Sequence, residues 1–185
     1  IRVIADIDTL STLPQEYVTD GMGEVVKSAC IRDRELLELL ERDCAFSPDL
    51  LTDVVRRCIL VKCRIVENDE HENGERKLLN FGHTIGHGIE SSSEGALYHG
   101  ECVALGMLPL CSPAVRARLI AVLKNCGLYR QPTYDWDKIA KAAFHDKKAD
   151  GGSVTVTLVQ EPGTYELKTM DCLDVMEQAK ACLEG

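Results

Sequence analysis

Aromatic side chains, positive charge and long uncharged apolar runs are all scarce in this sequence. Phe, Trp and Tyr together make up 5% of its 185 residues, and 21 Lys and Arg stand against 30 Asp and Glu, for a formal net charge of -9. With no basic run and no interleaving of basic and aromatic residues, we expect no nucleic-acid partner. The longest nearly uncharged apolar stretch, residues 102–111, contains Pro109 and is far shorter than the roughly 18 residues that span a bilayer. We therefore predict no membrane segment.

The sequence also lacks a regular cysteine framework. It has nine cysteines, an odd number, at irregular spacings and without a Cys-x-x-Cys pair. Most lie in apolar helical patterns, where reduced cysteine behaves as a small hydrophobic residue. Residues 1–8 alternate and carry charge, unlike a signal peptide. We predict buried free thiols in a cytoplasmic protein rather than a set of disulfides.

The patterns that are present predict one mainly α domain. Hydrophobic residues make up 45% of the chain, enough for a well-filled core, and there is neither an internal repeat nor a low-complexity linker. A short β-like run at residues 1–7 precedes a turn, and residues 67–75 form a loop. Residues 153–160 and 165–169 alternate as two strands of a small hairpin. Helical periodicity covers residues 20–30, 34–46, 49–67, 77–91, 101–110, 113–125, 136–144 and 172–183.

Chemically active residues concentrate between positions 76 and 101. Three of the five histidines, His83, His87 and His99, fall within 17 residues, beside Arg76 and Asn80. The first two are four apart on a predicted helix, so they project from one face and could share a metal ion. A catalytic zinc takes three nitrogen or oxygen ligands and keeps one open position, and the third could be His99 or one of several carboxylates. Isolated histidines more often cap helices or satisfy core hydrogen bonds, but the clustering favours a functional site.

Three glycines in the same helical pattern support this interpretation. Gly82, Gly86 and Gly88 each weaken a helix by roughly 1 kcal/mol relative to Ala. A helix that keeps all three needs them for the close approach of a neighbouring backbone or a ligand.

The run at positions 78–90, Leu-Leu-Asn-Phe-Gly-His-Thr-Ile-Gly-His-Gly-Ile-Glu, followed by Tyr-His-Gly-Glu-Cys-Val-Ala-Leu-Gly-Met at 98–107, closely resembles the signature of 3-dehydroquinate synthases, within the sugar-phosphate cyclase superfamily. Leu13-Pro14, Gly-Glu-Val-Val-Lys at 23–27, Lys62, Asp-Glu-His-Glu at 69–72 and Asp-Lys-Lys at 146–148 follow in the family's order, so the resemblance covers nearly the whole chain. It implies a mainly α, multi-helix C-terminal domain of the dehydroquinate synthase-like fold with a small β-hairpin, spanning residues 1–185, in which residues 1–20 form the inter-domain connection.

The resemblance also implies roles for individual residues. Metal ligands would be Glu24, His83 and His99, while His87 and Glu72 would serve acid/base or substrate-orienting roles, which both residue types can fill near neutral pH. Positions that match substrate contacts suit an anionic sugar acid phosphate, and a second set matches the segment that touches NAD. The substrate set is Lys27, Lys62, Arg76, Asn80 and Lys147, the last as one lysine of the pair with Lys148; the NAD set is Thr9, Leu10 and Thr12.

The implied reaction converts 3-deoxy-D-arabino-heptulosonate 7-phosphate to 3-dehydroquinate and phosphate, in the shikimate route to aromatic amino acids. NAD would transiently oxidise a substrate hydroxyl, and zinc or cobalt would act as a Lewis acid in this carbon–oxygen lyase. The family's N-terminal α/β domain supplies most of the NAD site, and this sequence begins where that domain would end. We therefore expect residues 1–185 alone to be inactive, and the full-length enzyme to be a homodimer.

Two positions depart from the family pattern, and three other functions compete. Gly23 stands where alanine is usual, and Ser28 where tyrosine or histidine is usual. The alternatives are another cyclase that makes 2-deoxy-scyllo-inosose or epi-valiolone, an iron-type alcohol dehydrogenase, and a non-catalytic zinc-stabilised helical module. Retention of His87 and of Leu79-Asn80 before Phe81 favours dehydroquinate synthase over the other cyclases. The dehydrogenases lack the motif at positions 24–27.

Overall fold

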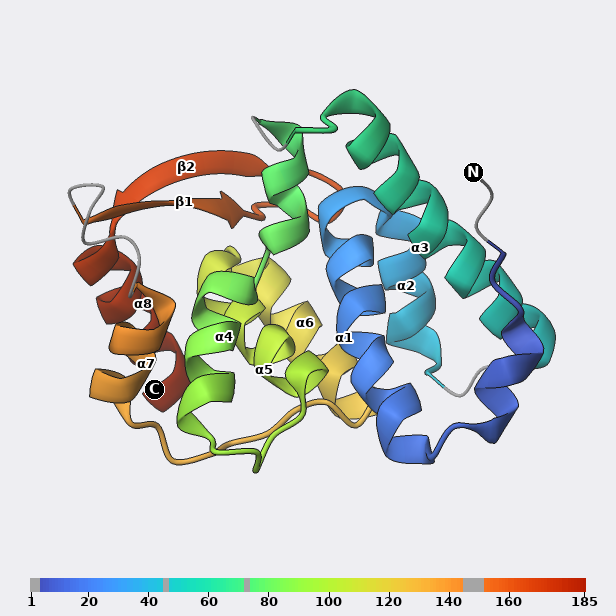
Figure 1. The fold of residues 1–185 in the computed structure, drawn as a ribbon, viewed down its shortest axis with the longest axis horizontal. Helices are drawn as coiled ribbons and strands as arrows, with labels where there is room; N and C mark the ends of the chain where they lie inside the picture. Colours follow the sequence, from blue (N-terminus) through green and yellow to red (C-terminus); the bar gives the residue numbers. More distant parts are fainter. Residues whose placement is uncertain (1–3, 45–46, 72–73, 145–151) are drawn as a thin grey trace.

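The structure is a computed structural model, and it describes residues 4–44, 47–71, 74–144 and 152–185. At its centre lies α5 (His99–Met107), in which every residue from 100 to 107 is buried. A mainly apolar helix that is buried on all sides is stable only when other elements surround it. Helices α1 (Gln15–Arg32) and α4 (His83–Ser92) both pack against α5 (Figure 1).

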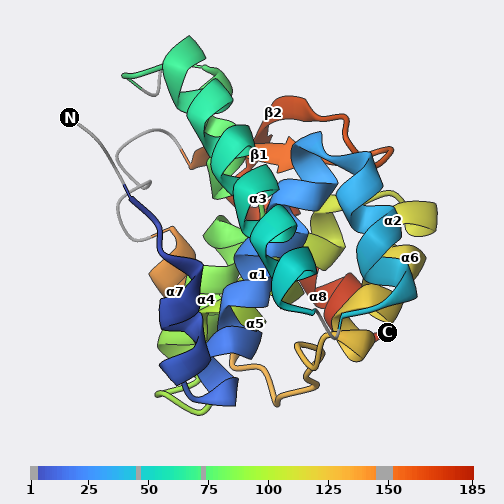
Figure 2. The same cartoon turned by 90° about the vertical axis from the view of Figure 1, so that its right-hand side faces the viewer.

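The remaining helices cover these three. Helices α2 (Arg34–Arg42) and α3 (Pro48–Asn68) pack on α1, with α3 lying across its outer side (Figure 2). Helix α6 (Pro113–Asn125) contacts α2, and α7 (Trp136–Ala143) contacts α4. The C-terminal helix α8 (Cys172–Glu184) packs on the short 3-10 helix η3 (Leu108–Leu110). None of the helices in the described part of the chain is long and apolar enough to cross a membrane.

A two-stranded antiparallel hairpin completes the fold. Strands β1 (Ser153–Leu158) and β2 (Glu166–Asp171) pair with Ser153 opposite Asp171 and Leu158 opposite Glu166. Alternation buries Val154 and Val156, and a parallel bridge from Val159 to Cys111 joins the hairpin to the helical core. The mainly helical fold with one small hairpin confirms the fold class predicted from the sequence.

Side-chain caps explain why several helices begin where the sequence predicts. The Asp33 carboxylate accepts from the backbone N–H of Leu36 at 3.0 Å, and the Ser112 hydroxyl accepts from Val115 N–H at 3.3 Å before Pro113, the first residue of α6. Such caps satisfy N–H groups that have no partner within the helix, and proline suits the first helical turn. Helix α6 therefore has the predicted limits.

One predicted element is not of the predicted kind, and another is divided in two. Of the β-like run at residues 1–7, positions 1–3 lie outside the described residues, 4–6 have no regular structure, and Ile7 begins the 3-10 helix η1 (Ile7–Thr12), so a strand over residues 4–7 is wrong. The helix predicted at 77–91 is two elements, η2 (Glu75–Asn80) and α4, separated by Gly82. Gly82 has φ +78°, and a Cβ there would lie 2.6 Å from the Val103 carbonyl oxygen. Close packing against α5 therefore breaks the helix.

The prediction that all cysteines are free is wrong for one pair. Cys44, just after α2, and Cys126, at the end of α6, form a disulfide. The two are 82 positions apart, so their spacing in sequence gives no hint of it; the packing of α2 on α6 brings them together. The other seven cysteines are free, and four of them, Cys30, Cys102, Cys111 and Cys172, are buried as predicted.

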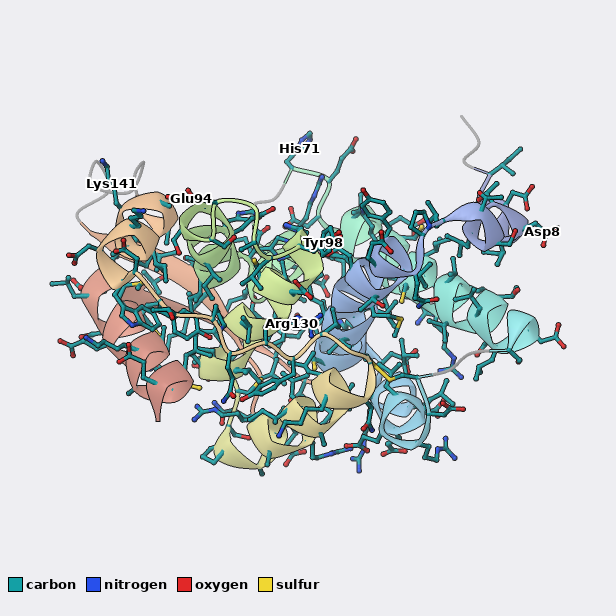
Figure 3. The ribbon with its side chains drawn as sticks, turned by 90° about the horizontal axis from the view of Figure 1, so that it is seen from below. Asp8, His71, Glu94, Tyr98, Arg130 and Lys141 are labelled. Carbon is teal, nitrogen blue, oxygen red and sulfur yellow. A yellow bond between two sulfur atoms is a disulfide. The ribbon has the colours of Figure 1, made fainter. Side chains whose placement is uncertain are left out.

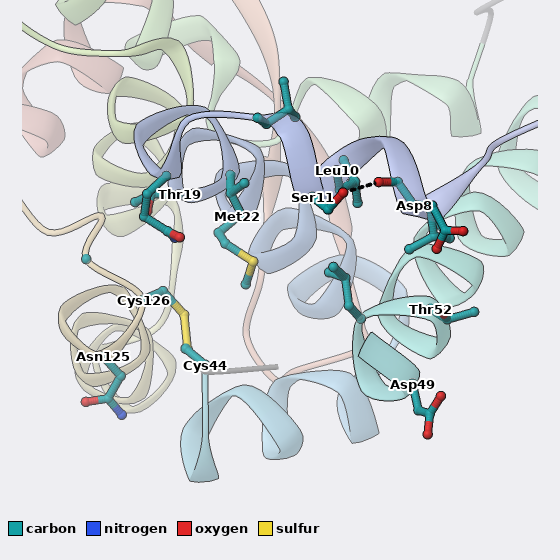
Figure 4. A pocket seen from close by; sticks show the side chains of 16 residues that line it. Asp8, Leu10, Ser11, Thr19, Met22, Cys44, Asp49, Thr52, Asn125 and Cys126 are labelled. Carbon is teal, nitrogen blue, oxygen red and sulfur yellow. Dashed lines mark hydrogen bonds between the residues drawn. A yellow bond between two sulfur atoms is a disulfide. The ribbon is translucent and has the colours of Figure 1, made fainter. Parts of the chain in front are cut away.

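An open pocket of about 950 Å³ lies beside this disulfide (Figure 4). Its walls come from η1, the start of α1, the start of α3 and the end of α6, and they include Leu10, Met22 and both disulfide cysteines. None of the three clustered histidines lines it. The chemistry predicted from the histidine motif is therefore located elsewhere in the fold.

Candidate metal centre

The three histidines predicted to cluster do so in the structure. The four-residue spacing places His83 and His87 one turn apart on α4, and His99 is the first residue of α5. One ring nitrogen from each lies within 4.8 Å of the other two, and the ring centroids are 5.2 to 5.6 Å apart. The packing of α4 on α5 thus gathers three imidazoles at one point.

Helix α1 brings a carboxylate to the same place. Glu24 Oε1 lies 3.4 Å from His83 Nε2. Ligand atoms about 2.0 to 2.1 Å from a tetrahedral zinc are separated from each other by about 3.3 Å, so this pair already has the required spacing. Three imidazole nitrogens and one carboxylate are donors that suit zinc and cobalt. The residues present fit such an ion.

Hydrogen bonds on the far side of the rings distinguish the histidines. His83 Nδ1 lies 3.1 Å from the Phe81 carbonyl oxygen, and His99 Nδ1 lies 3.0 Å from Glu90 Oε2. In both cases Nδ1 must carry the hydrogen, so in the neutral ring Nε2 has the free lone pair. Metal-bound histidines nearly always have such a partner on the other nitrogen. Among the described residues, His87 has ring contacts with the other two histidines and no hydrogen-bond partner.

Glu24 is held in a comparable way. Its Oε2 lies 2.6 Å from Lys27 Nζ, which also donates to the Leu79 carbonyl oxygen at 2.8 Å. Burial favours a raised pKa for Glu24, but its interactions with His83 and with the charge of Lys27 outweigh this effect and lower the pKa to about 2. Glu24 is therefore an anion at neutral pH, with Oε1 facing the histidines.

The same surroundings lower the pKa values of Lys27 and His87. Burial lowers the pKa of Lys27, Glu24 opposes this, and the nearby charge of Lys62 on α3 lowers it further. Partial desolvation of the ring and the neighbouring His83 and His99 lower the pKa of His87. His87 is consequently neutral at neutral pH and is exposed.

A network that sequence reasoning missed fixes the start of α5. Glu101 is buried; one of its oxygens accepts from Tyr98 N–H at 3.0 Å, and the other pairs with Arg130 at 2.8 Å. Asp20, one turn before Glu24 on α1, accepts from Gly100 N–H. The three-residue spacing from Tyr98 to Glu101 is the capping-box spacing and could have indicated the first contact, whereas Asp20 and Arg130 join only through the tertiary fold.

Glycines permit the close approach of the three central helices, as the sequence predicted. A Cβ on Gly86 would lie 2.9 Å from the Cys102 carbonyl oxygen in α5, and one on Gly88 would lie 2.8 Å from Ile139 in α7. On α1, a Cβ on Gly23 would lie 2.6 Å from the Cα of Gly100. Gly23, one of the two departures from the family pattern, therefore brings the helix of Glu24 against the helix of His99.

The predicted substrate contacts are less tightly gathered. Lys62 is exposed on α3, and Asn80 is exposed at the end of η2. Arg76 on η2 donates through Nη1 to the Glu70 carbonyl oxygen at 2.5 Å. Glu72 and Lys147 lie outside the described residues. His71, beside Glu72, is exposed and points away from the body of the molecule (Figure 3).

The predicted cofactor contacts lie on η1. The hydroxyls of Thr9 and Thr12 donate to the backbone carbonyls of Asp6 and Thr9, at 2.6 and 2.9 Å. Leu10 lines the pocket of Figure 4. Their role towards NAD stays a prediction.

The family model described as 3-dehydroquinate synthase C-terminal matches residues 21–149. The chain belongs to this family. Among curated relatives, the 3-dehydroquinate synthase of Dehalococcoides mccartyi (strain CBDB1) is 38% identical over 196 aligned positions, covering 96% of this chain and 55% of the relative. That of Pelobacter propionicus is 39% identical over 167 positions, covering 82% of this chain and 46% of the relative. The chain thus spans about half the length of these relatives.

Solved structures of related cyclases share the fold. A 2-deoxy-scyllo-inosose synthase complexed with carbaglucose-6-phosphate, NAD+ and Co2+ has a TM-score of 0.79 and 27% identity, over 97% of this chain and 55% of that one. The 2-epi-5-epi-valiolone synthase ValA from Streptomyces hygroscopicus, with NAD+ and Zn2+ bound, has a TM-score of 0.82 over 97% of this chain and 54% of that one. At 24% identity, the second likeness bears on the fold alone.

Proposed function

We propose that this chain is the metal- and substrate-binding part of a 3-dehydroquinate synthase, a lyase that converts 3-deoxy-D-arabino-heptulosonate 7-phosphate to 3-dehydroquinate and phosphate. The observation that carries the proposal is the meeting of Glu24, His83 and His99 from three helices, each held by a hydrogen bond or ion pair on the side away from the others. Family membership and the names of the curated relatives support the reaction. NAD and either zinc or cobalt are the proposed cofactors, in line with the NAD+ and Co2+ of the related 2-deoxy-scyllo-inosose synthase and with the zinc-type donor set of the site.

Glu24, His83 and His99 are the proposed metal ligands, and His87 is excluded from them. Spacing alone favours His83 with His87, and all three histidines are close enough to share an ion. The hydrogen-bond pattern separates them, because His83 and His99 each have one nitrogen engaged and the other presented, as metal ligands do. His87 is left free to exchange protons with a substrate.

The reaction needs charge neutralisation, positioning and proton transfer, and the chain supplies groups for each. A bound zinc would supply Lewis acidity towards substrate oxygen atoms. Lys27, Lys62 and Arg76 would attract the carboxylate and phosphate of the substrate, Arg76 bidentately and the lysines as point charges. His87 can hold or release a proton at either ring nitrogen, since neither is engaged among the described residues. Glu72 is proposed as a second acid/base group, with Asn80 and Lys147 as further substrate contacts.

The metal assignment is tested by zinc stoichiometry. Glu24→Ala and His99→Ala should each abolish the binding of one zinc per chain, whereas His87→Ala should retain it. Loss of zinc in His87→Ala with retention in Glu24→Ala would reverse the assignment. His71→Ala is the matched control, because His71 is exposed and lies outside the cluster.

The substrate assignment is tested by joining the chain to a family-type NAD-binding domain and measuring phosphate release. We expect turnover of the heptulosonate phosphate and none from residues 1–185 alone, because most of the NAD site would come from that other domain, with residues 1–20 as the connection and Thr9, Leu10 and Thr12 touching NAD. Another cyclase is the second candidate, favoured by the 2-deoxy-scyllo-inosose synthase likeness. Turnover of glucose 6-phosphate without turnover of the heptulosonate phosphate would establish that alternative. The joined protein is also expected to be a homodimer.

A further inference from the structure

We infer that Glu90 is a positioning residue that holds the His99 ring with its Nε2 towards the metal site. The inference rests on the proposed metal site. It concerns a residue that neither the histidine spacing nor the resemblance picked out. Its starting point is the contact of 3.0 Å between Glu90 Oε2 and His99 Nδ1.

Helix geometry places Glu90 where it can reach across to α5. His83, His87 and Glu90 stand at positions i, i+4 and i+7 of α4, so they share one face. Glu90 is therefore on the face that carries the site, one turn beyond His87. Gly86 lets α4 approach α5 closely, since a Cβ there would lie 2.9 Å from the Cys102 carbonyl oxygen. At this helix separation the Glu90 side chain spans from α4 to the first residue of α5.

The chemistry of the contact sets the state of the ring. An ionised carboxylate accepts hydrogen bonds but cannot donate them, so His99 Nδ1 carries the hydrogen. In the neutral ring this leaves the lone pair on Nε2. His83 is held in the same tautomer by the neutral Phe81 carbonyl oxygen. The bond from His99 is charge-assisted and hence stronger, and a carboxylate in this position makes the opposite nitrogen a better metal ligand.

An ordinary surface ion pair would behave differently. The side chains of His99 and Glu90 are 39% and 40% exposed, and pairs with that exposure contribute little to folding stability. Removing Glu90 should therefore leave the stability of the metal-free chain nearly unchanged. A large loss of metal affinity without a loss of stability has to act through the His99 ring.

The experiment compares Glu90→Ala and Glu90→Gln with Glu94→Ala in the full chain. Glu94 is the matched control: it is a nearby glutamate whose loss changes the charge equally, and it pairs with Lys138 at 3.0 Å, away from the histidines. Zinc affinity is measured by competition with a chelator. We expect Glu90→Ala to bind zinc about 10- to 100-fold more weakly than the wild type. The zinc affinity of Glu90→Gln should lie between those of Glu90→Ala and the wild type, and that of Glu94→Ala should equal the wild-type value.

A second measurement does not need the metal. Proton–nitrogen correlation spectra of the metal-free chain, recorded at mildly alkaline pH, report the tautomer of each histidine. His99 should be protonated at Nδ1 in the wild type and in Glu94→Ala, and should shift towards a mixture in Glu90→Ala. His83 should give the same signal in all variants, because its contacts with Phe81 and Glu24 do not involve Glu90.

The results separate this inference from the proposed function. If His99→Ala abolishes zinc binding but Glu90→Ala binds zinc as tightly as Glu94→Ala, the metal site stands and the role of Glu90 is overturned. If the wild type binds no zinc, both fail. An unchanged His99 tautomer in Glu90→Ala overturns the inference whatever the zinc affinity of that variant. The inference is also overturned if Glu90→Ala loses as much folding free energy as zinc-binding free energy.

Discussion

Two glycines on α1, Gly21 and Gly23, allow the packing of α1 on α5 to be measured by a single methyl group. Both lie in the interior of the same helix, so alanine gains the same intrinsic helix propensity at either, about 1 kcal/mol. Their surroundings differ. A Cβ at Gly21 meets nothing within 4 Å, whereas a Cβ at Gly23 would lie 2.6 Å from both the Cα and the carbonyl oxygen of Gly100.

The structure gives the expected magnitudes. Carbon atoms pack at about 3.5 to 4.0 Å, so Gly23→Ala forces α1 and α5 apart by about 1 Å, because backbone atoms cannot rotate away. Overpacking of this kind costs about 1 to 3 kcal/mol. Gly21→Ala should stabilise the chain by about 0.4 to 1 kcal/mol. Since the propensity gain cancels between the two variants, their difference in unfolding free energy should be about 1 to 3 kcal/mol.

Urea unfolding measures this difference. With a slope of about 2 kcal/mol/M for a chain of this size, the two midpoints should differ by about 0.5 to 1.5 M. Gly23→Ala should also weaken zinc binding, because it moves Glu24 away from His99, while Gly21→Ala should leave it unchanged. The substitution introduces the residue expected from the family resemblance, so its cost measures how closely the helices have approached in this chain. Equal stabilisation by both variants would refute the reasoning.

Three further predictions follow from contacts in the structure. The pKa of Glu24 is lowered from 4.5 to about 2 in the folded chain, so the stability that Glu24 contributes should be present above about pH 4.5 and lost as the pH falls towards 2. The measurement is the difference in urea unfolding free energy between the wild type and Glu24→Gln. A difference that stays constant over that pH range would contradict the prediction. Thiol titration of the denatured chain should give seven free thiols before reduction and nine after it. Reduction of the Cys44–Cys126 disulfide should lower the unfolding free energy by about 2 to 4 kcal/mol. Nine free thiols before reduction would show that the disulfide is absent. Arg130→Ala should lower the urea unfolding free energy by about 1 kcal/mol, because buried Glu101 loses its charged partner while the Arg130 side chain is itself 48% exposed. An unchanged unfolding midpoint would show that water replaces the guanidinium as the partner of Glu101.

Local signals were enough for most of the fold. Helix α6 has its predicted limits because Ser112, Pro113 and Gly127 mark them in the sequence, and the hairpin follows from alternation with a turn between. The C-terminal end of the helix predicted at 34–46 was placed too far along the chain, since α2 ends at Arg42. The part of the predicted N-terminal strand that the structure describes, residues 4–7, is not a strand, and among the described residues β1 and β2 pair only with each other.

The site was predictable only in part. The spacing of His83 and His87 could be read directly, whereas the hydrogen bonds that distinguish the rings come from Phe81 and Glu90 in the folded chain. Glu24 lies 59 positions before His83, so no local pattern could connect them, and only the resemblance did so. The disulfide was hidden for the same reason, being a pair set by the packing of two distant helices.

The break at Gly82 has a further consequence for how the site is built. In an unbroken helix through positions 77–91, the carbonyl of Leu79 would bond to the backbone N–H of residue 83 and that of Phe81 to residue 85. Here the first hydrogen bond into α4 starts instead from the Gly82 carbonyl, which accepts from Gly86 N–H. The interruption releases two backbone acceptors, and these are the ones that hold Lys27 and His83. Any substitution that restored a continuous helix would thus remove two supports of the metal site without changing any residue that faces it.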